Sequence, residues 1–381
     1  MLVGITFGIA REPDEVQAVQ RLRYEVYVEE LGRYRALAHH DARLLVEPED
    51  RHSWLAYAAD DGDVVAATRL TWGGAGFSDR QVDQYELHPW LTELPGDLLM
   101  VGERTTVRSS YRGAGVLDEL VEWTSSVPDE HGVRVVFGCC EPHLLSLYIA
   151  MGQQPYAERN INSDEAGYLI PLVGFAHGTE TLRGASRIRG PAELPACVER
   201  VLGGASGVLS STQVPSDEYW VGIRRVLDGL RERRVGAFDG LSDEEALRCV
   251  ERSNVIDCRA GDRLLAQGGT ARNMFVVLSG DLEVRDDGRL VGALGGGDIF
   301  GEMAFLLEQQ RTFDVVAVTD ARVLSLSEGS LRRMIANDAD VAAKLLLNVA
   351  KMLCARLIRA ERMPGLAGAP TGTDGPTTAP P

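Results

Sequence analysis

The C-terminal third of the chain is patterned as many short apolar runs rather than a few long ones. Turns that contain glycine and aspartate, such as Gly261-Asp262 and Ser279-Gly280-Asp281, separate these runs. Short strands at this spacing, with one short helix inserted after Phe300, predict an antiparallel β-roll or barrel. The runs expected to form strands are residues 274–278, 282–284, 290–294, 315–318 and 322–326.

A helical period follows the roll. Apolar residues recur at helical spacing from Val341 to Leu357, which predicts a long helix ending near Arg362. Such a helix either closes over a ligand held in the roll or is a plain core helix, and the pattern fits both. Residues 363–381 are mainly Gly, Ala, Pro and Thr, so a disordered tail is expected there.

The N-terminal half mixes strand and helix patterns. Apolar runs at 64–70, 101–107 and 133–138 indicate strands, and residues 141–152 indicate a helix that ends at a glycine. The whole chain is therefore predicted to be α+β. Its expected parts are a mixed α/β domain at 1–175, a helical linker or extension at 176–235, a β-roll domain at 236–362 and a tail at 363–381. Within the linker, residues 219–234 are expected to form a helix that relays a signal between the two domains, because they directly precede the roll.

The segment Phe300-Gly301-Glu302-Met303-Ala304, followed by Arg311-Thr312, combines a helix-opening turn, a carboxylate and a guanidinium. Amides at a helix N-terminus bind anions, a carboxylate accepts from ribose hydroxyls, and an arginine clamps phosphate oxygens. This combination suits a cyclic nucleotide.

From about Phe238 to Arg362 the chain resembles the cyclic nucleotide-binding domain family of the CRP/FNR type. The resemblance implies cAMP or cGMP as effector, with Glu302 on the ribose 2′-hydroxyl and Arg311 on the cyclic phosphate. The other implied contacts are the amides of Gly301, Met303 and Ala304 and the side chain of Thr312. Gln310 and Phe313 replace the family's usual proline and small residue, so the ring of Phe313 either crowds the phosphate pocket or turns into the core. A domain that keeps the fold without binding nucleotide stays an alternative.

A second motif, Arg112-Gly113-Ala114-Gly115-Val116-Leu117, links a strand to a helix. Strand, turn and helix N-terminus again present amides to an anion, here suited to an extended pyrophosphate. With the strands and helix around it, the motif resembles the GCN5-related N-acyltransferase (GNAT) superfamily over about residues 1–175. That resemblance implies acyl-CoA as donor, held by Val107, Arg112, Gly113, Ala114, Gly115 and Val116. Leu117 departs from the family's small residue.

Acyl transfer from a thioester needs a nucleophile freed of its proton, a polarised carbonyl and a proton for the leaving thiolate. Glu103 is the candidate base, directly or through water, and Tyr148 the candidate proton donor. A strand amide near Thr106 or Val107 is the candidate for polarising the carbonyl. The alternatives are an ion pair between Glu103 and an arginine, and a core ring for Tyr148.

Residues 21–32, the acidic residues Glu47, Glu49 and Asp50, and Arg69 look like the autoinducer-synthase and N-acyl amino acid synthase branch. By that resemblance Arg23, Tyr27 and Arg69 would shape a site for an amine acceptor, and an acyl carrier protein is an alternative donor.

The net charge of −17 disfavours nucleic acid as a partner, because phosphate backbones are bound by basic surfaces. No run approaches the about 18 apolar residues of a membrane span. The six cysteines show no paired metal spacing, which predicts reduced thiols in a cytoplasmic protein and no metal site. A homo-oligomer is compatible with the sequence.

The sequence as a whole predicts an N-acyltransferase that moves an acyl group to a primary amine and is regulated by a cyclic nucleotide. Two alternatives stay open: a non-enzymatic signalling or docking protein with a decayed acyltransferase fold, and a protein lysine acetyltransferase.

Overall fold

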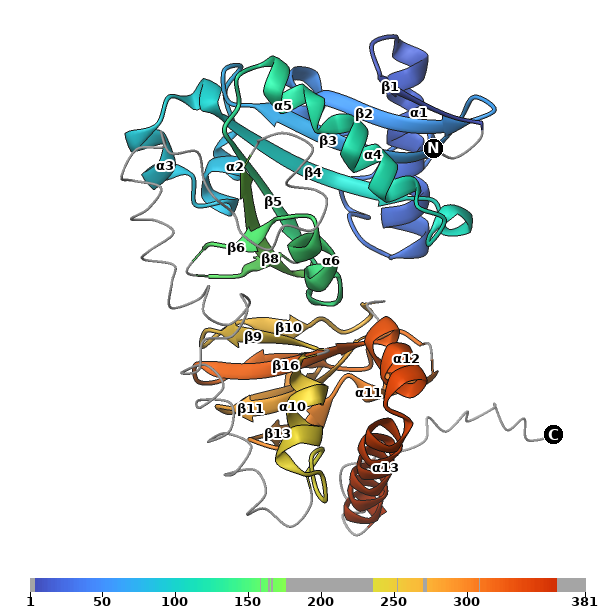
Figure 1. The fold of residues 1–381 in the computed structure, drawn as a ribbon, viewed down its shortest axis with the longest axis vertical. Coiled ribbons are helices and arrows are strands. Elements are labelled where there is room, and N and C mark those ends of the chain that lie inside the picture. Colours follow the sequence, from blue (N-terminus) through green and yellow to red (C-terminus); the bar gives the residue numbers. More distant parts are fainter. Residues whose placement is uncertain are drawn as a thin grey trace, which may run out of the picture.

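The computed structural model describes residues 4–157, 159–163, 165, 167–175, 236–251, 253–269, 273–307 and 309–361. The linker predicted at 176–235, with the relay expected at 219–234, lies outside the described residues, and so does the tail expected at 363–381. Figure 1 shows the described elements of the N-terminal part above those of the C-terminal part.

The N-terminal part is built on an eight-stranded sheet with the order β1-β2-β3-β4-β5-β8-β6, in which β7 also pairs with β8. Each pairing is antiparallel except that of β4 with β5, which is parallel. This mixed sheet confirms the mixed α/β architecture predicted for this part. The strands are β1 (Ile5–Ile9), β2 (Trp54–Asp60), β3 (Asp63–Trp72), β4 (Leu99–Val107), β5 (Val135–Cys140), β6 (Gln154–Pro155), β7 (Ile161–Ser163) and β8 (Gly167–Phe175).

Helices cover both faces of this sheet. α1 (Pro13–Arg23) shares an apolar cluster with Ala67 of β3, and α4 (Val116–Thr124) shares one with Ala66. Neighbouring strand residues point to opposite faces, so the two helices lie on opposite sides. Because both faces are covered, β3 is buried over most of its length, and its first half is continuously apolar from Val64 to Ala67.

Short helical segments complete the N-terminal part. The helix predicted at 141–152 is in fact a 3₁₀ turn followed by a short α-helix, which agrees with Pro142 at the first position of the turn. The remaining segments are the π-helical η1 (Tyr24–Glu30), the α-helices α2 (Asp79–Gln84), α3 (His88–Glu93), α5 (Ser126–Glu130) and α6 (Leu145–Ala150), and the 3₁₀ turns η2 (Pro48–His52), η3 (Gly96–Leu98), η4 (Ser109–Tyr111) and η5 (Pro142–Leu144).

Two irregularities in β4 position the site described below. β4 and β5 pair only from Leu99–Val135 to Val101–Phe137, although β4 continues to Val107. On its other edge, β4 carries one residue more than β3 between two registered pairs, which is a β-bulge. The bulge contains Arg104, whose φ of 57° is uncommon for a residue with a side chain. A bulge bends a strand and redirects its side chains, and this one does so where β4 leaves β5.

The C-terminal part consists of two four-stranded sheets, β10-β15-β12-β13 and β14-β11-β16-β9, paired antiparallel throughout. The predicted β-roll is therefore confirmed. The sequence pattern had indicated neither β9, β10 nor β14. The strands are β9 (Asn254–Cys258), β10 (Arg263–Leu265), β11 (Asn273–Ser279), β12 (Leu282–Asp286), β13 (Arg289–Leu294), β14 (Ile299–Phe300), β15 (Asp314–Ala317) and β16 (Ala321–Ser327).

Among the described residues, four α-helices accompany this roll. α11 (Glu302–Leu307) is the short helix expected after Phe300, and α13 (Ala339–Glu361) is the expected long helix. Val341, Leu345 and Val349 bury the inner face of α13 in a core cluster, whereas Leu357 is 62% exposed. The others are α10 (Asp243–Glu251) and α12 (Glu328–Asn337).

Candidate functional site

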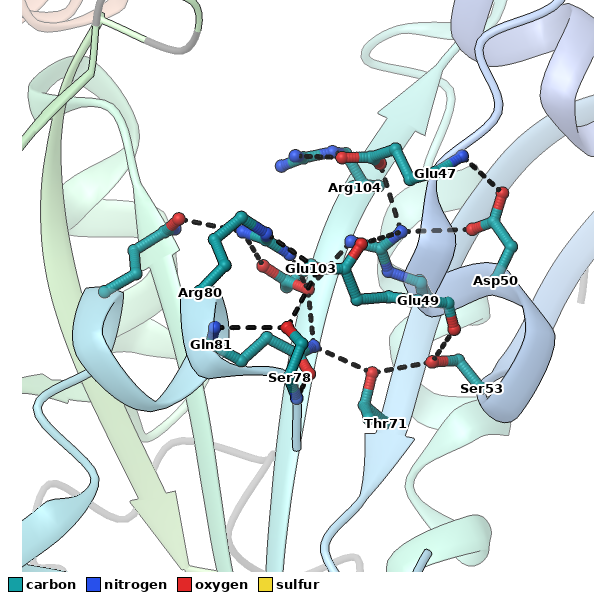
Figure 2. Close-up of polar contacts among 12 residues, drawn as sticks. Glu47, Glu49, Asp50, Ser53, Thr71, Ser78, Arg80, Gln81, Glu103 and Arg104 are labelled. Atoms are coloured by element: carbon teal, nitrogen blue, oxygen red, sulfur yellow. Dashed lines mark hydrogen bonds and ion pairs between the residues drawn. The ribbon is translucent and has the colours of Figure 1, made fainter. Parts of the chain in front are cut away.

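The N-terminal part holds a largely buried cluster of charged side chains, most of which Figure 2 draws. The cluster contains as many guanidinium groups as carboxylates, which arrive from α1, β3, β4, α2 and the segment around η2. Its members are Arg23, Arg69, Arg80, Arg104, Glu47, Glu49, Asp50 and Glu103.

Arg69 lies at the middle of this cluster and is fully buried. Its Nη1 donates to Glu47 Oε2 and Asp50 Oδ1, both at 3.0 Å, and its Nη2 donates to Glu103 Oε2 at 2.9 Å. A buried guanidinium is stable only when carboxylates surround it, because removing charge from water is costly. The pairing explains why several acidic residues stand close together around η2.

Glu103 is 3% exposed. Its Oε2 accepts from Arg69, from Arg80 at 3.1 Å and from Gln81 at 2.8 Å, and Tyr85 donates to its Oε1 at 3.3 Å. Burial alone would raise the pKa of this carboxyl, but the neighbouring arginines outweigh burial and hold the pKa far below its ordinary value. A carboxylate so stabilised is a weak proton acceptor. The ion pair given above as the alternative for Glu103 is present in the structure.

Arg80, Gln81 and Tyr85 were not singled out from the sequence. A signal was present, because Ser78 and Gln81 form a capping box at the start of α2. The Gln81 side chain accepts from the Ser78 amide through one atom and donates to Glu103 through the other. One short helix thus fixes two donors of the cluster.

Of the three acceptor residues expected by resemblance, Arg23 and Arg69 are fully buried and Tyr27 is half-buried. Arg23 and Arg69 are both 0% exposed, so they support the site rather than face it. Tyr27 lies in the π-helical η1 and donates to Thr105 O of β4 at 3.3 Å. Its ring packs edge-on against Tyr34, over which the Arg104 guanidinium lies 4.6 Å from the ring centroid.

Tyr148, the predicted proton donor, lies on α6 and is half-buried. Burial raises the pKa of its hydroxyl well above its ordinary value, and Thr105 is among the groups that act on it. The hydroxyl therefore keeps its proton at neutral pH, as a donor must. Tyr27 and Tyr148 are both linked to Thr105, which directly follows the bulge residue Arg104.

The predicted pyrophosphate turn lies between η4 and α4. Gly113 and Gly115 have φ of 78° and 84°, and a Cβ at either would meet nothing within 4 Å. No side chain caps the first turn of α4. Arg112 is held by Glu30, with 2.8 Å between Nη2 and Oε2, and by Val107 O at 3.0 Å from Nε.

The other residues predicted for this turn have mixed surroundings. Val116 is 1% exposed and its side chain packs into the core beneath α4. The Ala114 amide donates to Tyr111 O at 3.3 Å. An anion on this turn would therefore meet glycine backbone and the start of α4, and it would compete with Glu30 for Arg112.

The second predicted site, in the roll, brings Gly301, Glu302 and Arg311 together. Arg311 is 3% exposed and donates to Gly301 O at 2.6 Å and to Asn273 O and Oδ1 at 2.6 and 2.8 Å. Burial lowers the pKa of its guanidinium to about 10, against the opposing effect of Glu141 and Glu302. Glycine is required at 301, because a Cβ there would lie 2.6 Å from Arg311 Nη1 and φ is 76°.

The carboxylate of this site has a protein partner. Arg356 of α13 pairs with Glu302, 2.8 Å from Nη1 to Oε1, and also donates to Ile299 O. The sequence gave no signal for Arg356. Of the other predicted residues, Ala304 is buried, Met303 is 44% exposed and Thr312 is exposed at the surface. Phe313 is half-buried.

Comparison with known proteins identifies the C-terminal part. Residues 255–338 match the family model of the cyclic nucleotide-binding domain. This match confirms the resemblance predicted for the C-terminal region. A CRP-like cAMP-activated global transcriptional regulator of Mycobacterium tuberculosis is 26% identical over 125 residues, covering 32% of this chain and 56% of the relative. The chain thus spans about half the length of this curated relative.

Among solved structures, the chain is similar to a CoA-dependent acyl-homoserine lactone synthase, BjaI, solved with MTA. The likeness has a TM-score of 0.38 and 17% identity, and covers 45% of this chain and 79% of that one. A putative N-acetyltransferase from Lactobacillus plantarum has a TM-score of 0.34 and 18% identity, covering 46% of this chain and 99% of the other. Among the described residues, no helix has the length and apolar character needed to cross a membrane.

Proposed function

We propose that this protein is an N-acyltransferase that moves an acyl group from acyl-CoA to a primary amine, and that cAMP or cGMP bound to the roll regulates it. The observation that carries the enzymatic part is the separation of β4 from β5 beside a glycine turn and α4. A thioester lying along the separated strands would have Tyr148 and the post-bulge residues of β4 near its carbonyl. The enzyme would comprise residues 1–175 and the sensor residues 236–362.

In the proposed reaction the amine nitrogen attacks the thioester carbonyl, a C–N bond forms and the C–S bond breaks. The amine loses a proton to water, water later restores the proton of the general acid, and the leaving thiolate gains one proton from that acid. Tyr148 supplies that proton, and a β4 amide at Thr106 or Val107 polarises the carbonyl. Glu103 acts as a fixed anion that orders Arg69, Arg80 and Tyr85 rather than as the proton acceptor.

The donor contacts of the proposal are the turn residues Arg112 to Val116, together with Val107. Arg112 is available to a pyrophosphate only after leaving Glu30, since the two are already paired. This pairing is also the observation that favours the rival function, a docking protein whose donor site is closed.

The test is incubation of the full chain with acetyl- and long-chain acyl-CoA, and separately with acylated carrier protein, in the presence of free amino acids or a lysine-containing protein. Mass spectrometry should detect an N-acylated amine. Thermal stabilisation by acyl-CoA should accompany it. No product and no stabilisation with any donor would overturn the enzymatic proposal in favour of docking. Acylation of protein lysine alone would assign a lysine acetyltransferase.

Tyr148→Phe is expected to lower the acyl-transfer rate about 100-fold or more, because general acid catalysis typically contributes that much. The donor KM should stay near its wild-type value, since only a hydroxyl is removed. Tyr57→Phe is the matched control, because the Tyr57 hydroxyl donates to Glu15 of α1 and Tyr57 lies on β2, which β3 separates from β4. Equal steady-state rates for Tyr148→Phe and wild type would contradict the role.

Gly301→Ala is expected to weaken cyclic nucleotide binding at least about 10-fold, because the new Cβ would displace Arg311. Gly288→Ala is the control, since Gly288 also has a positive φ, 79°, but open space around it. Both variants should lose about 1–2 kcal/mol of stability from the backbone conformation. Calorimetric titration should show weakened binding for Gly301→Ala alone, and equal affinities of both variants would argue against the proposed pocket.

A further inference from the structure

The two parts of the chain meet at one described surface. η5, β7 and β8 of the N-terminal part lie against β9, β10 and β16 of the roll, as Figure 1 shows for β8 and the roll strands. A single apolar cluster contains residues from both sides, among them Leu145, Ile170 and Phe275. The polar bonds across the surface include those from Asn254 Nδ2 to Pro142 O (3.1 Å), Asn160 Nδ2 to Asp257 O (2.9 Å), Asn162 Nδ2 to Asp262 Oδ1 (2.9 Å), Arg263 N to Asn162 Oδ1 (2.8 Å) and Tyr168 OH to Asp262 Oδ2 (3.2 Å).

One of these bonds, from Asn254 to Pro142, is connected through neighbouring residues to Arg311 of the predicted nucleotide site. Arg311 Nη2 donates to Asn273 Oδ1 at 2.8 Å, and Asn273 Nδ2 donates to Ser325 Oγ at 3.0 Å. Ser325 of β16 is directly opposite Asn254 of β9 in the sheet register, and Asn254 crosses to Pro142. Asn273 is 2% exposed and Ser325 1%, so water does not compete freely for these bonds.

Beyond Pro142, the path enters the helix of the proposed catalytic tyrosine. Pro142 opens η5, and α6 follows without a break and carries Tyr148. Leu145, the first residue of α6, is 1% exposed and is held in the shared cluster, against which Tyr148 also packs. A displacement at Pro142 is therefore passed to α6 through continuous backbone.

A second, charged contact lies beside the same turn. Glu141 pairs with Arg33 at 2.6 Å, and His143 Nδ1 lies 3.4 Å from Glu141 Oε2. The pKa of the Glu141 carboxyl is lowered: burial opposes this, and Arg33, His143 and the more distant Arg311 cause it. The positive charge of Arg311 thus acts on Glu141 and His143, the residues on either side of Pro142.

We propose that Asn273, Ser325 and Asn254 form a relay that transmits the occupancy of Arg311 to η5 and α6. The relay rests on the proposed function, because a cyclic phosphate is what would take the Arg311 guanidinium from Asn273. Asn273 then loses the hydrogen-bond donor to its side-chain oxygen and reorients. The hydrogen bond from its side-chain nitrogen to Ser325 Oγ changes as a result. The change crosses the β16–β9 pair to Asn254 and alters its bond to Pro142. Couplings between sites in proteins typically change an affinity about 5- to 150-fold, and the same factor acts in both directions.

The surface offers a matched pair of variants. Asn254→Ala removes the relay bond to Pro142. Asn162→Ala removes two bonds at the same surface, to Asp262 Oδ1 at 2.9 Å and from the Arg263 amide at 2.8 Å, neither of which is connected to Arg311. Ser325→Ala breaks the relay one step earlier while leaving every direct contact of Arg311 intact. None of the three residues has been placed in the acyl-transfer site or in direct contact with the nucleotide.

The experiment combines calorimetric titration with cAMP and cGMP and hydrogen exchange of the amides at 142–150, on the full chain with and without nucleotide. In the wild type, nucleotide should change exchange in this segment. Asn254→Ala and Ser325→Ala should bind nucleotide within about threefold of wild type but lose the exchange change, whereas Asn162→Ala keeps it. Acyl-transfer rates should lose their nucleotide dependence in the same two variants.

The possible outcomes distinguish a failure of the relay from a failure of the proposed function on which it rests. Nucleotide binding without any exchange change at 142–150 overturns the relay and leaves the sensor intact. Loss of the response in Asn162→Ala as well overturns the relay in favour of coupling spread over the whole surface. Absence of nucleotide binding to the wild type overturns the proposed sensor, and the relay with it.

Discussion

Glu103→Ala is expected to destabilise the folded protein by about 3–5 kcal/mol, the cost of breaking a buried ion pair by removing one partner. The variant leaves Arg69 fully buried with one carboxylate fewer, and it also removes the acceptor of Gln81 and Tyr85. The free energy of unfolding, measured in urea, is the readout.

Glu29→Ala is the matched control for this prediction. Glu29 pairs with Arg43 at 2.7 Å, but the two side chains are 40% and 60% exposed. An exposed pair contributes about 0–1 kcal/mol, so the control should unfold close to wild type. If Glu103→Ala unfolded like Glu29→Ala, the buried cluster would not be a structural centre, and a catalytic role for an accessible Glu103 would return.

Arg311→Ala is expected to weaken cyclic nucleotide binding about 30-fold to several thousand-fold, because losing a buried charged partner costs about 2–5 kcal/mol. Regulation of acyl transfer should disappear with it, while the rate without nucleotide is retained. Calorimetry and the rate with and without nucleotide are the measurements.

Arg332→Ala controls for the loss of a positive charge, since the Arg332 side chain is 75% exposed and, within the part of the chain that the structure describes, is paired with Glu328 of its own helix. Circular dichroism of Arg311→Ala should match the wild type, which separates lost binding from lost folding. Wild-type nucleotide affinity in a folded Arg311→Ala would contradict the pocket.

Local features of the chain were predictable from sequence because neighbouring residues determine them. The short helix after Phe300 and the glycine turn before α4 are cases of this kind, since turn residues and helix starts carry their own signals. The roll was predicted from its turn spacing, but β9, β10 and β14 were missed. β10 and β14 are very short, and short strands depend on their partners for recognition.

The roles within the sites depended on contacts between distant elements. Glu103 was found from its strand, but its weak basicity comes from Arg69 and Arg80, which approach from β3 and α2. Arg69 lies opposite Glu103 in the register of β3 and β4, beside the bulge at Arg104, and a bulge of one residue leaves no mark in an apolar pattern. Arg356 lies more than fifty residues after Glu302 in sequence, so only the packing of α13 brings them together.

The separation of β4 from β5 also makes the sheet incomplete at its centre. Past Val101 and Phe137, each of these strands is paired on its outer side only, and a row of backbone donors and acceptors faces the gap. Unpaired strand edges accept extended segments that carry amides at regular intervals. Under the proposed function, a donor with amide groups in its arm would bind as a substitute strand, and backbone hydrogen bonds would set how deep it lies whatever acyl group it carries.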